Sequence, residues 1–247
     1  MEDIQRNKII AFVDILGFKT LINSAEKNKV IDFLYELRNI DSRFRENFIN
    51  RETLNGYIVV TKIHPDISSY SDHLLISAPI NLDSLQSITT SLAYISYTII
   101  DIQLLALKRG FALRGAIAHG EIFYDEEKKI FAGQALIEAI EGESCVAKYP
   151  RVIICKSVKD LLEIKKLEKI DFSFLESDFD GVKFLNFLDA KYISQKFKDS
   201  IENELNLFND IIQKRIEESK DSIEVLSKWE WLVNYYNLSL DRINKYS

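Results

Sequence analysis

The sequence predicts an α+β fold of the split-βαβ, ferredoxin-like type, with an antiparallel-rich central sheet, flanking helices and a C-terminal helical extension. Short apolar runs typical of strands alternate with longer segments in which apolar residues recur every three or four positions, in the order β-α-β-β-α-β-β-α-β. No internal repeat, low-complexity tract or Gly/Ser-rich linker divides the 247 residues. We therefore expect one domain over residues 1–190 and a helical extension over residues 191–247 that packs on the domain or on a dimer partner.

The first half of the chain predicts the first strands and two long helical segments. In chain order, we expect a buried strand over Ile9–Ile15, a helical segment from Phe18 to about Phe48, strands over Tyr57–Ile63 and Ile67–Ser77, and a helix over Leu82–Arg109. Pro65 marks a turn between the two later strands. Gly110 directly follows two cations, a combination that favours the end of a helix there.

The second half predicts shorter elements and the helical tail. In chain order, we expect a bent strand or strand pair over Phe111–Tyr124, a charged turn over Asp125–Lys129, a helix from Gln134 to about Glu143, a strand over Tyr149–Cys155, a short helix over Ser157–Lys169 and a hairpin over Phe172–Leu188. Asp180-Gly181 is the turn of that hairpin. From about Ser194 the apolar residues lie on one helical face, so we expect the tail to be helical.

Composition excludes several classes of function. The formal net charge of −6 argues against nucleic-acid binding as the main role, since that role needs a clustered basic face. Cys145 and Cys155 have no metal-ligand spacing and favour free thiols in a reducing cytoplasm. The apolar stretch Ser91–Leu107 is interrupted by Asp101 and Gln103 and is short for a membrane span, so we expect no direct membrane insertion.

Two aspartates stand out because they lie within apolar strands. Asp14 is part of the strand Ile9–Ile15 and is followed by Gly17, while Asp72 precedes the apolar residues of a later strand. A carboxylate in a core is costly unless it is paired or used. Two carboxylates near a helix that begins at a glycine predict a site for a divalent cation and a polyphosphate.

Each of these residues also has a structural interpretation. Asp14 could cap the helix that begins near Leu16. Asp72 could be a turn residue, although the apolar run that follows it favours an insertion within a strand. Arg114 could be a structural ion-pair partner, and Tyr70 a half-buried strand aromatic. His73 has no partner at metal-ligand spacing, so we expect it to be structural or exposed.

The order of elements and several motifs resemble the catalytic domain of class III nucleotidyl cyclases. The first metal motif of that family, Phe-x-Asp-Ile-x-Gly-Phe, is matched without gaps by Phe12–Phe18. Asp72 occupies the place of the second metal Asp, and Arg114–Gly120 is similar to a later Arg-x-Gly-Ile-x-x-Gly strand. Gly133–Ala139 resembles the helix of the dimerisation arm, and the likeness covers about Ile9 to Leu188.

The sequence departs from this family where purine cyclases contact the base and ribose. The arm-helix Asn and Arg of purine cyclases are replaced by Ile137 and Glu141, and the base-reading Lys and Asp by Ser68 and Ile130. The purine contacts are therefore missing while both metal carboxylates remain. This combination resembles the uridylate and cytidylate cyclases of bacterial Pycsar anti-phage systems, whose terminal helix is similar to Lys228–Asn237.

The resemblance implies a role for each candidate site residue. Asp14 and Asp72, with the Ile15 carbonyl, are expected to hold two Mg²⁺ or Mn²⁺ ions. Arg114 is expected to contact phosphate or base, and Tyr70, which would share a strand face with Asp72, to contact the pyrimidine. The backbone amides expected to bind the β- and γ-phosphates are those of Leu16, Gly17 and Phe18.

The function that the resemblance implies is a cytoplasmic, homodimeric lyase. It would convert UTP or CTP to the 3′,5′-cyclic monophosphate and pyrophosphate, as a second messenger for a separate cyclic-nucleotide effector in phage defence. Two alternatives stay open: a catalytically inactive nucleotide-binding or dimerisation module on the same fold, and an ATP or GTP cyclase with an atypical pocket.

Overall fold

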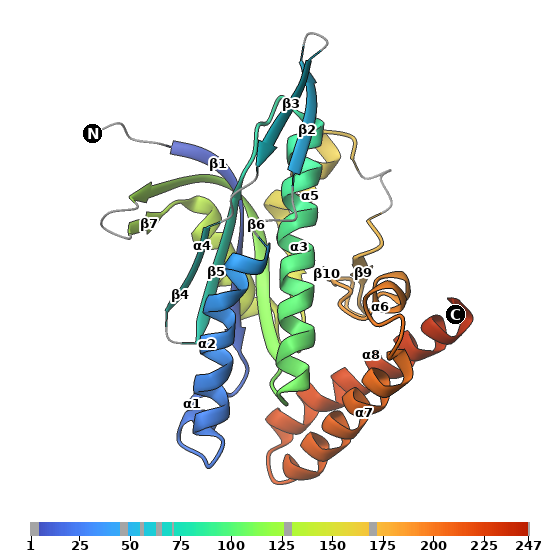
Figure 1. Cartoon of the computed structure of the whole chain (residues 1–247). Coiled ribbons are helices and arrows are strands. Elements are labelled where there is room, and N and C mark those ends of the chain that lie inside the picture. The colour runs from blue at the N-terminus through green and yellow to red at the C-terminus, as the bar shows by residue number, and fades with distance from the viewer. Residues whose placement is uncertain are drawn as a thin grey trace.

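The computed structural model describes residues 5–44, 49–54, 57–62, 66–70, 72–125, 130–167 and 172–246. Its centre is an eight-stranded sheet (Figure 1). Seven of the strands follow the order β4-β5-β1-β6-β8-β10-β9, and the eighth, β7, pairs with β6. The strands are β1 (Gln5–Ile15), β4 (Asp66–Tyr70), β5 (His73–Pro79), β6 (Leu113–Asp125), β7 (Ile130–Ala132), β8 (Val152–Ile154), β9 (Leu175–Ser177) and β10 (Lys183–Leu185). β1 is antiparallel to both β5 and β6, and β8 is parallel to β6.

The predicted α+β fold is confirmed by the order β4-β5-β1-β6. Each neighbouring pair among these four strands is antiparallel, and the helices that connect them have the split-βαβ connectivity expected from the sequence. Ile9, Ile10 and Ala11 in β1 are completely buried, as expected for the central strand of a sheet that is covered on both faces.

The helices cover this sheet and extend it at the C-terminus. They are α1 (Phe18–Ile22), α2 (Lys27–Phe44), α3 (Leu85–Lys108), α4 (Gln134–Glu141), the π-helix η1 (Gly142–Val146), α5 (Lys156–Ile164), α6 (Ala190–Lys196), α7 (Ile201–Glu218) and α8 (Ile223–Tyr246). α3 has the length and hydropathy of a membrane span, but 72% of its most apolar window is buried inside the fold. It is the main core helix, and the Ser84 hydroxyl caps its start by accepting a hydrogen bond from the Ser87 amide.

The helical segment expected from Phe18 to Phe48 is instead two helices. The Ser24 hydroxyl accepts a hydrogen bond from the Glu26 amide at 3.0 Å, and such a side-chain turn competes with continuation of the helix. Beyond α2, β2 (Ile49–Leu54) was not predicted, and it pairs with β3 (Tyr57–Lys62) in a separate two-stranded sheet. The expected strand Tyr57–Ile63 therefore lies outside the main sheet, as Figure 1 shows.

The expected strand Ile67–Ser77 is divided by a tight turn into β4 and β5. Tyr70 is paired with His73, so Asp72 lies in the turn and not within a strand. The prediction of a strand insertion at Asp72 was wrong, because the apolar run that suggested it begins only after His73. The face-sharing argument for Tyr70 and Asp72 fails with it, and the Tyr70 side chain lies outside the described residues.

The C-terminal helices pack against the β9–β10 end of the sheet. Asp178 accepts a hydrogen bond from Trp231 Nε1 at 2.8 Å and also pairs with the buried Arg151. The Tyr235 hydroxyl donates to Asn186 Oδ1 at 2.6 Å and accepts from the Leu188 amide at 2.8 Å. Because these buried aromatic side chains also form hydrogen bonds, they fix the position of α8 on the sheet.

Candidate metal centre

Strand register brings three candidate side chains together. Asp14 in β1 lies directly opposite His73 of β5 on one side and Arg114 of β6 on the other. Side chains of directly opposed residues in antiparallel strands project from the same face of the sheet. The three residues therefore form one row across β5, β1 and β6, at the end of β1 that leads into Gly17.

Asp72 joins this row from the turn before β5. One ligand atom each from Asp14, Asp72 and His73 lie within 4.8 Å of one another. His73 Nδ1 is 3.3 Å from Asp72 Oδ1, and its ring stacks on Phe12 with centroids 4.8 Å apart. His73 was expected to be structural or exposed, yet the fold places its ring nitrogen beside both predicted metal carboxylates.

The Asp14 carboxylate is buried and incompletely paired. Its side chain is 12% exposed, and Oδ1 is buried without a hydrogen-bond partner. Burial, followed by the hydrogen bond and negative charge of Asp72, raises the pKa of Asp14 from 3.8 to about 6. The charge of Glu143 also raises this pKa, and that of His73 opposes the rise. Two carboxylates in this arrangement repel each other unless a proton or a cation lies between them.

Arg114 bridges two carboxylates at the edge of the cluster. Its Nε donates to Asp14 Oδ2 at 3.4 Å and lies 2.7 Å from Glu143 Oε1. Glu143 reaches this position from η1. η1 can approach β6 closely because Gly142 has no side chain: a Cβ there would lie only 2.8 Å from the Ala116 Cβ. Sequence reasoning missed Glu143, since a π-helical turn has no sequence signature at this spacing.

The donor set fits a divalent cation. Mg²⁺ and Mn²⁺ prefer oxygen ligands, Mn²⁺ also accepts imidazole, and both ions neutralise neighbouring carboxylates. The unpartnered Asp14 Oδ1 and the nearby Asp72 and His73 atoms supply such ligands.

The Leu16 amide donates to the Ala112 carbonyl of the neighbouring chain segment at 2.9 Å. Since successive residues of an antiparallel strand alternate direction, the Ile15 carbonyl faces the other side, toward β5.

The Leu16 hydrogen bond corrects one prediction. Its amide is committed to Ala112 and is not free to bind a phosphate. Gly17 is the N-cap of α1 with φ 76°, and its carbonyl accepts from the Thr20 and Leu21 amides. The first amides of a helix have no acceptor within the helix. The Phe18 amide, at the start of α1, is therefore the group near Asp14 that remains a candidate for binding a phosphate.

The structure also decides between interpretations of Asp14 and Arg114. No side chain caps α1, so Asp14 is not its N-cap. Arg114 does form the structural ion pairs that its alternative interpretation expected, with Asp14 and Glu143 as partners. An ion pair and a substrate contact are compatible for a guanidinium, which has five donors.

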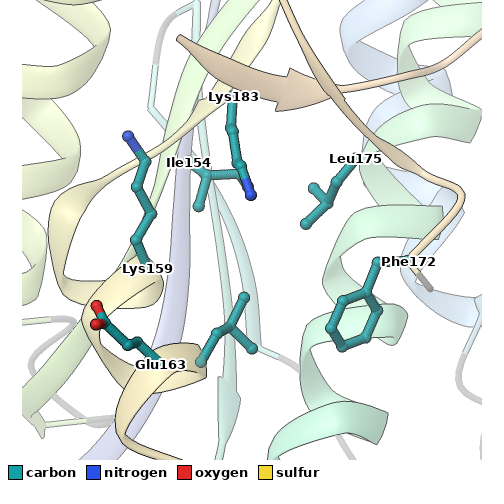
Figure 2. Close-up of a pocket in the computed structure, with 7 residues that line it drawn as sticks. Ile154, Lys159, Glu163, Phe172, Leu175 and Lys183 are labelled. Atoms are coloured by element: carbon teal, nitrogen blue, oxygen red, sulfur yellow. The ribbon is translucent and has the colours of Figure 1, made fainter. Parts of the chain in front are cut away.

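A separate cavity of about 420 Å³ lies between α5 and the β9–β10 hairpin (Figure 2). Lys159 and Glu163 line one side of it and Phe172 the other, with Lys183 extending from β10. It contains none of the predicted site residues, so the candidate metal centre and this cavity are distinct.

A scan of protein-family models and a search of curated proteins find no match to this chain. Among solved structures, it is similar to the monomeric guanylyl cyclase domain of the RhoGC fusion protein from the fungus Blastocladiella emersonii, at 12% identity over 73% of this chain and 94% of that chain, with a TM-score of 0.44. It is similar to the guanylate cyclase domain of RhGC from Catenaria anguillulae in complex with GTP, at 11% identity over 72% and 93% of the chains, with a TM-score of 0.44. A Class III adenylyl cyclase-like ATP-binding protein from Pseudomonas aeruginosa matches at 12% identity over 64% and 35% of the chains, with a TM-score of 0.39.

Proposed function

We propose that this protein is a divalent-metal-dependent nucleotide cyclase that converts UTP or CTP to a 3′,5′-cyclic monophosphate and pyrophosphate. One observation carries the proposal: Asp14 and Asp72, from separate elements, converge with His73 while Asp14 Oδ1 stays buried without a partner. The gap-free match of Phe12–Phe18 to the cyclase metal motif supports the same reading.

In this proposal the chain's own groups bind and orient the nucleotide. Two bound Mg²⁺ or Mn²⁺ ions would lower the pKa of the ribose 3′-hydroxyl and neutralise charge on the departing pyrophosphate. Asp14 and Asp72 would hold the ions, with the Ile15 carbonyl as a further oxygen ligand. The Gly17 turn and the Phe18 amide would bind β- and γ-phosphate oxygens at the start of α1.

Arg114 would stabilise negative charge on the phosphates. Its Nε already faces Asp14 and Glu143, which leaves the remaining N–H groups of the planar guanidinium to reach a phosphate oxygen. Glu143 would orient Arg114 without touching the substrate.

The preference for a pyrimidine rests on what stands at the purine-reading positions. Ile137 on α4 is 50% exposed and Ile130 on β7 is 46% exposed. Because both side chains are hydrocarbons, neither can form a hydrogen bond with a base. Tyr70, at the end of β4, is the proposed pyrimidine contact.

The proposed active form is a homodimer, in which each site takes residues from both protomers. α4 and η1 present exposed apolar side chains at Ile137, Ile140 and Val146, a surface that suits a partner subunit. The cyclic product would act in the cytoplasm on a separate cyclic-nucleotide effector in anti-phage defence.

The geometry also favours a second candidate, a nucleotide-binding module without turnover. Arg114 is paired with both Asp14 and Glu143, and Ile137 and Glu141 stand where purine cyclases carry their catalytic Asn and Arg. Such a module would bind UTP or CTP with metal and release no pyrophosphate.

The test is turnover of each of the four ribonucleoside triphosphates with Mn²⁺, with products identified by mass spectrometry. We expect cyclic UMP or cyclic CMP and stoichiometric pyrophosphate, lost by at least about 100-fold in Asp14→Asn and Asp72→Asn. Asp160→Asn, which removes a surface carboxylate paired with Lys156, is the matched control and should retain activity.

Each other outcome has a defined meaning. Turnover of only ATP or GTP would overturn the pyrimidine assignment. Metal-dependent binding of UTP or CTP by calorimetry without pyrophosphate release would identify the non-catalytic module. No metal-dependent binding of any nucleotide would overturn both candidates.

A further inference from the structure

A second cavity, of about 300 Å³, lies between the loop at Leu16 and Gly17, which follows β1, and the C-terminal helices. One wall is formed by the loop and α1, at Leu16, Gly17, Thr20 and Leu21. The facing wall comes from α7 and α8, at Arg215, Val225 and Trp229. The C-terminal extension is therefore packed beside the loop that carries the candidate site, near the lower ends of α1 and α3 in Figure 1.

Arg215 of α7 connects this extension to two other segments of the chain. Its Nη1 and Nη2 donate to the two carboxylate oxygens of Glu26, each at 2.8 Å. Its Nε donates to the Gly110 carbonyl at 2.9 Å, and Glu218 accepts from Nη1 at 3.0 Å. The side chain is only 14% exposed, and bidentate pairs of this kind fix geometry as well as supplying energy.

The turn at Gly110 is shaped to receive this guanidinium. Gly110 has φ +81°, and a Cβ at this position would lie 2.9 Å from Arg215 Nη2 and 3.3 Å from Nε. Gly110 therefore ends α3 and also leaves room for the Arg215 guanidinium, since a larger residue would collide with it.

The two segments that Arg215 holds lead directly into the candidate site. Glu26 lies at the start of α2, just beyond α1 and the Gly17 turn, while Gly110 is followed by β6 and Arg114. The same two segments are joined by the hydrogen bond from the Leu16 amide to the Ala112 carbonyl. In addition, Val225 of α8 lines the same cavity as Gly17 and Ala112, so the beginning of α8 lies close to both segments.

We infer that Arg215 is a positioning residue of the C-terminal extension, which holds the Gly17 turn and the beginning of β6 in fixed relation to each other. The extension is then part of the scaffold of the active site and not an independent appendage. The kinetic consequence of this inference rests on the proposed function, but the structural consequence does not.

The test combines hydrogen exchange with kinetics on the full-length chain. In Arg215→Ala and Glu26→Gln, we expect amide exchange over residues 16–26 and 109–114 to rise by roughly tenfold or more. The double variant should show no further rise over Arg215→Ala alone, because that variant has already lost the Arg215–Glu26 pair. Lys214→Ala, which removes an exposed cation of the same helix, is the matched control and should exchange like the wild type.

Arg215→Lys provides a second test if Arg215→Ala fails to fold. A lysine keeps the charge but cannot engage Glu26 and Gly110 together, so we expect it to fold and to show raised exchange over the same two segments. Exchange that is unchanged, confined to α7, or raised equally throughout the chain would each overturn the inference. With UTP or CTP and Mn²⁺, the variants should raise KM about five- to tenfold, more than they reduce kcat.

The two hypotheses fail in different ways. If no nucleotide is cyclised by the wild type but exchange rises as expected, the proposed function is wrong and the positioning role stands. If the wild type cyclises a nucleotide and neither exchange nor KM changes in the variants, the positioning role is wrong.

Discussion

Asp14 lies at the centre of the candidate metal site. Register places it between His73 and Arg114, and the turn before β5 brings Asp72 to it. Burial and the Asp72 carboxylate outweigh the opposing effect of His73, so the pKa of Asp14 rises to about 6. In the absence of a cation, folding therefore favours the protonated form of this carboxyl.

This shift predicts how stability depends on pH. The folded-state pKa of Asp14 is raised above the ordinary value of 3.8, so its stabilising contribution is fully present below that value and is lost as the pH rises through about 6. The loss corresponds to on the order of 3 kcal/mol. We expect the Tm of the metal-free protein to fall between pH 4 and pH 7, and the Asp14→Asn variant to lose much of this dependence.

Calorimetry with and without Mn²⁺ provides the check. Mn²⁺ should raise the Tm of the wild type more at pH 7 than at pH 5, because ligand carboxylates must be deprotonated. In Asp14→Asn this Mn²⁺ effect should disappear. An equal pH dependence in wild type and variant would contradict the assigned burial of the carboxylate.

Glu143 predicts a second residue-scale effect. Its side chain is 5% exposed and faces Arg114, so Glu143→Gln removes one charge of a buried pair. We expect the free energy of unfolding to fall by about 1–3 kcal/mol, because Arg114 keeps a charge with fewer partners. Denaturant unfolding measures this, and Glu163→Gln, on the exposed surface of α5, should leave stability within about 0.5 kcal/mol of the wild type.

At the scale of elements, the connection from β1 to α1 depends on the Gly17 turn. Gly17 has φ +76°, and a Cβ there would have no heavy atom within 4 Å. The space in front of this turn is open, in the position where the phosphates are proposed to bind. Gly181, in the β9–β10 turn, has φ +77° and equally open surroundings, so it shares the backbone conformation without the proposed function.

Matched alanine substitutions at these two glycines separate strain from binding. Each should cost about 1 kcal/mol of stability, because alanine disfavours a positive φ. Only Gly17→Ala should reduce nucleotide turnover, by roughly tenfold or more, since its methyl group would hold the phosphates away from the backbone amides. Equal turnover in the two variants, measured by pyrophosphate release, would exclude phosphate binding at this turn.

At the scale of the whole molecule, exposed apolar side chains on α4 and η1 suit a subunit interface. Ile137 is 50% exposed and Ile140 is 40% exposed. We expect Ile137→Asp to convert a dimer to a monomer and to abolish turnover, because each proposed site needs both protomers. Ile164→Asp is the control, because Ile164 is 74% exposed and belongs to α5 rather than to α4 or η1. Sedimentation analysis distinguishes the outcomes, and a wild type that is monomeric and active would refute the shared site.

Local patterns predicted much of the architecture. The apolar run of β1, the three- and four-residue spacing of α3 and the glycine that ends it, and the hairpin at Asp180-Gly181 all correspond to elements of the structure. They were predictable because each depends on residues close together in the chain. The break after α1, the β2–β3 pair and the turn at Asp72 were not, since similar apolar and polar patterns suit more than one local structure.

The amino-acid sequence by itself determined the two carboxylates, the glycine beside the first of them and the apolar periodicity that makes an α+β fold. The tertiary structure decided what these residues meet: His73 and Arg114 opposite Asp14, Glu143 arriving from a π-helix, and Arg215 fastening the C-terminal helices beneath the Gly17 turn. The physical reason is the range of the interactions. Strand and helix propensities act over a few residues, whereas register, burial and ion pairs join residues that are far apart in the chain and become close only when the sheet assembles.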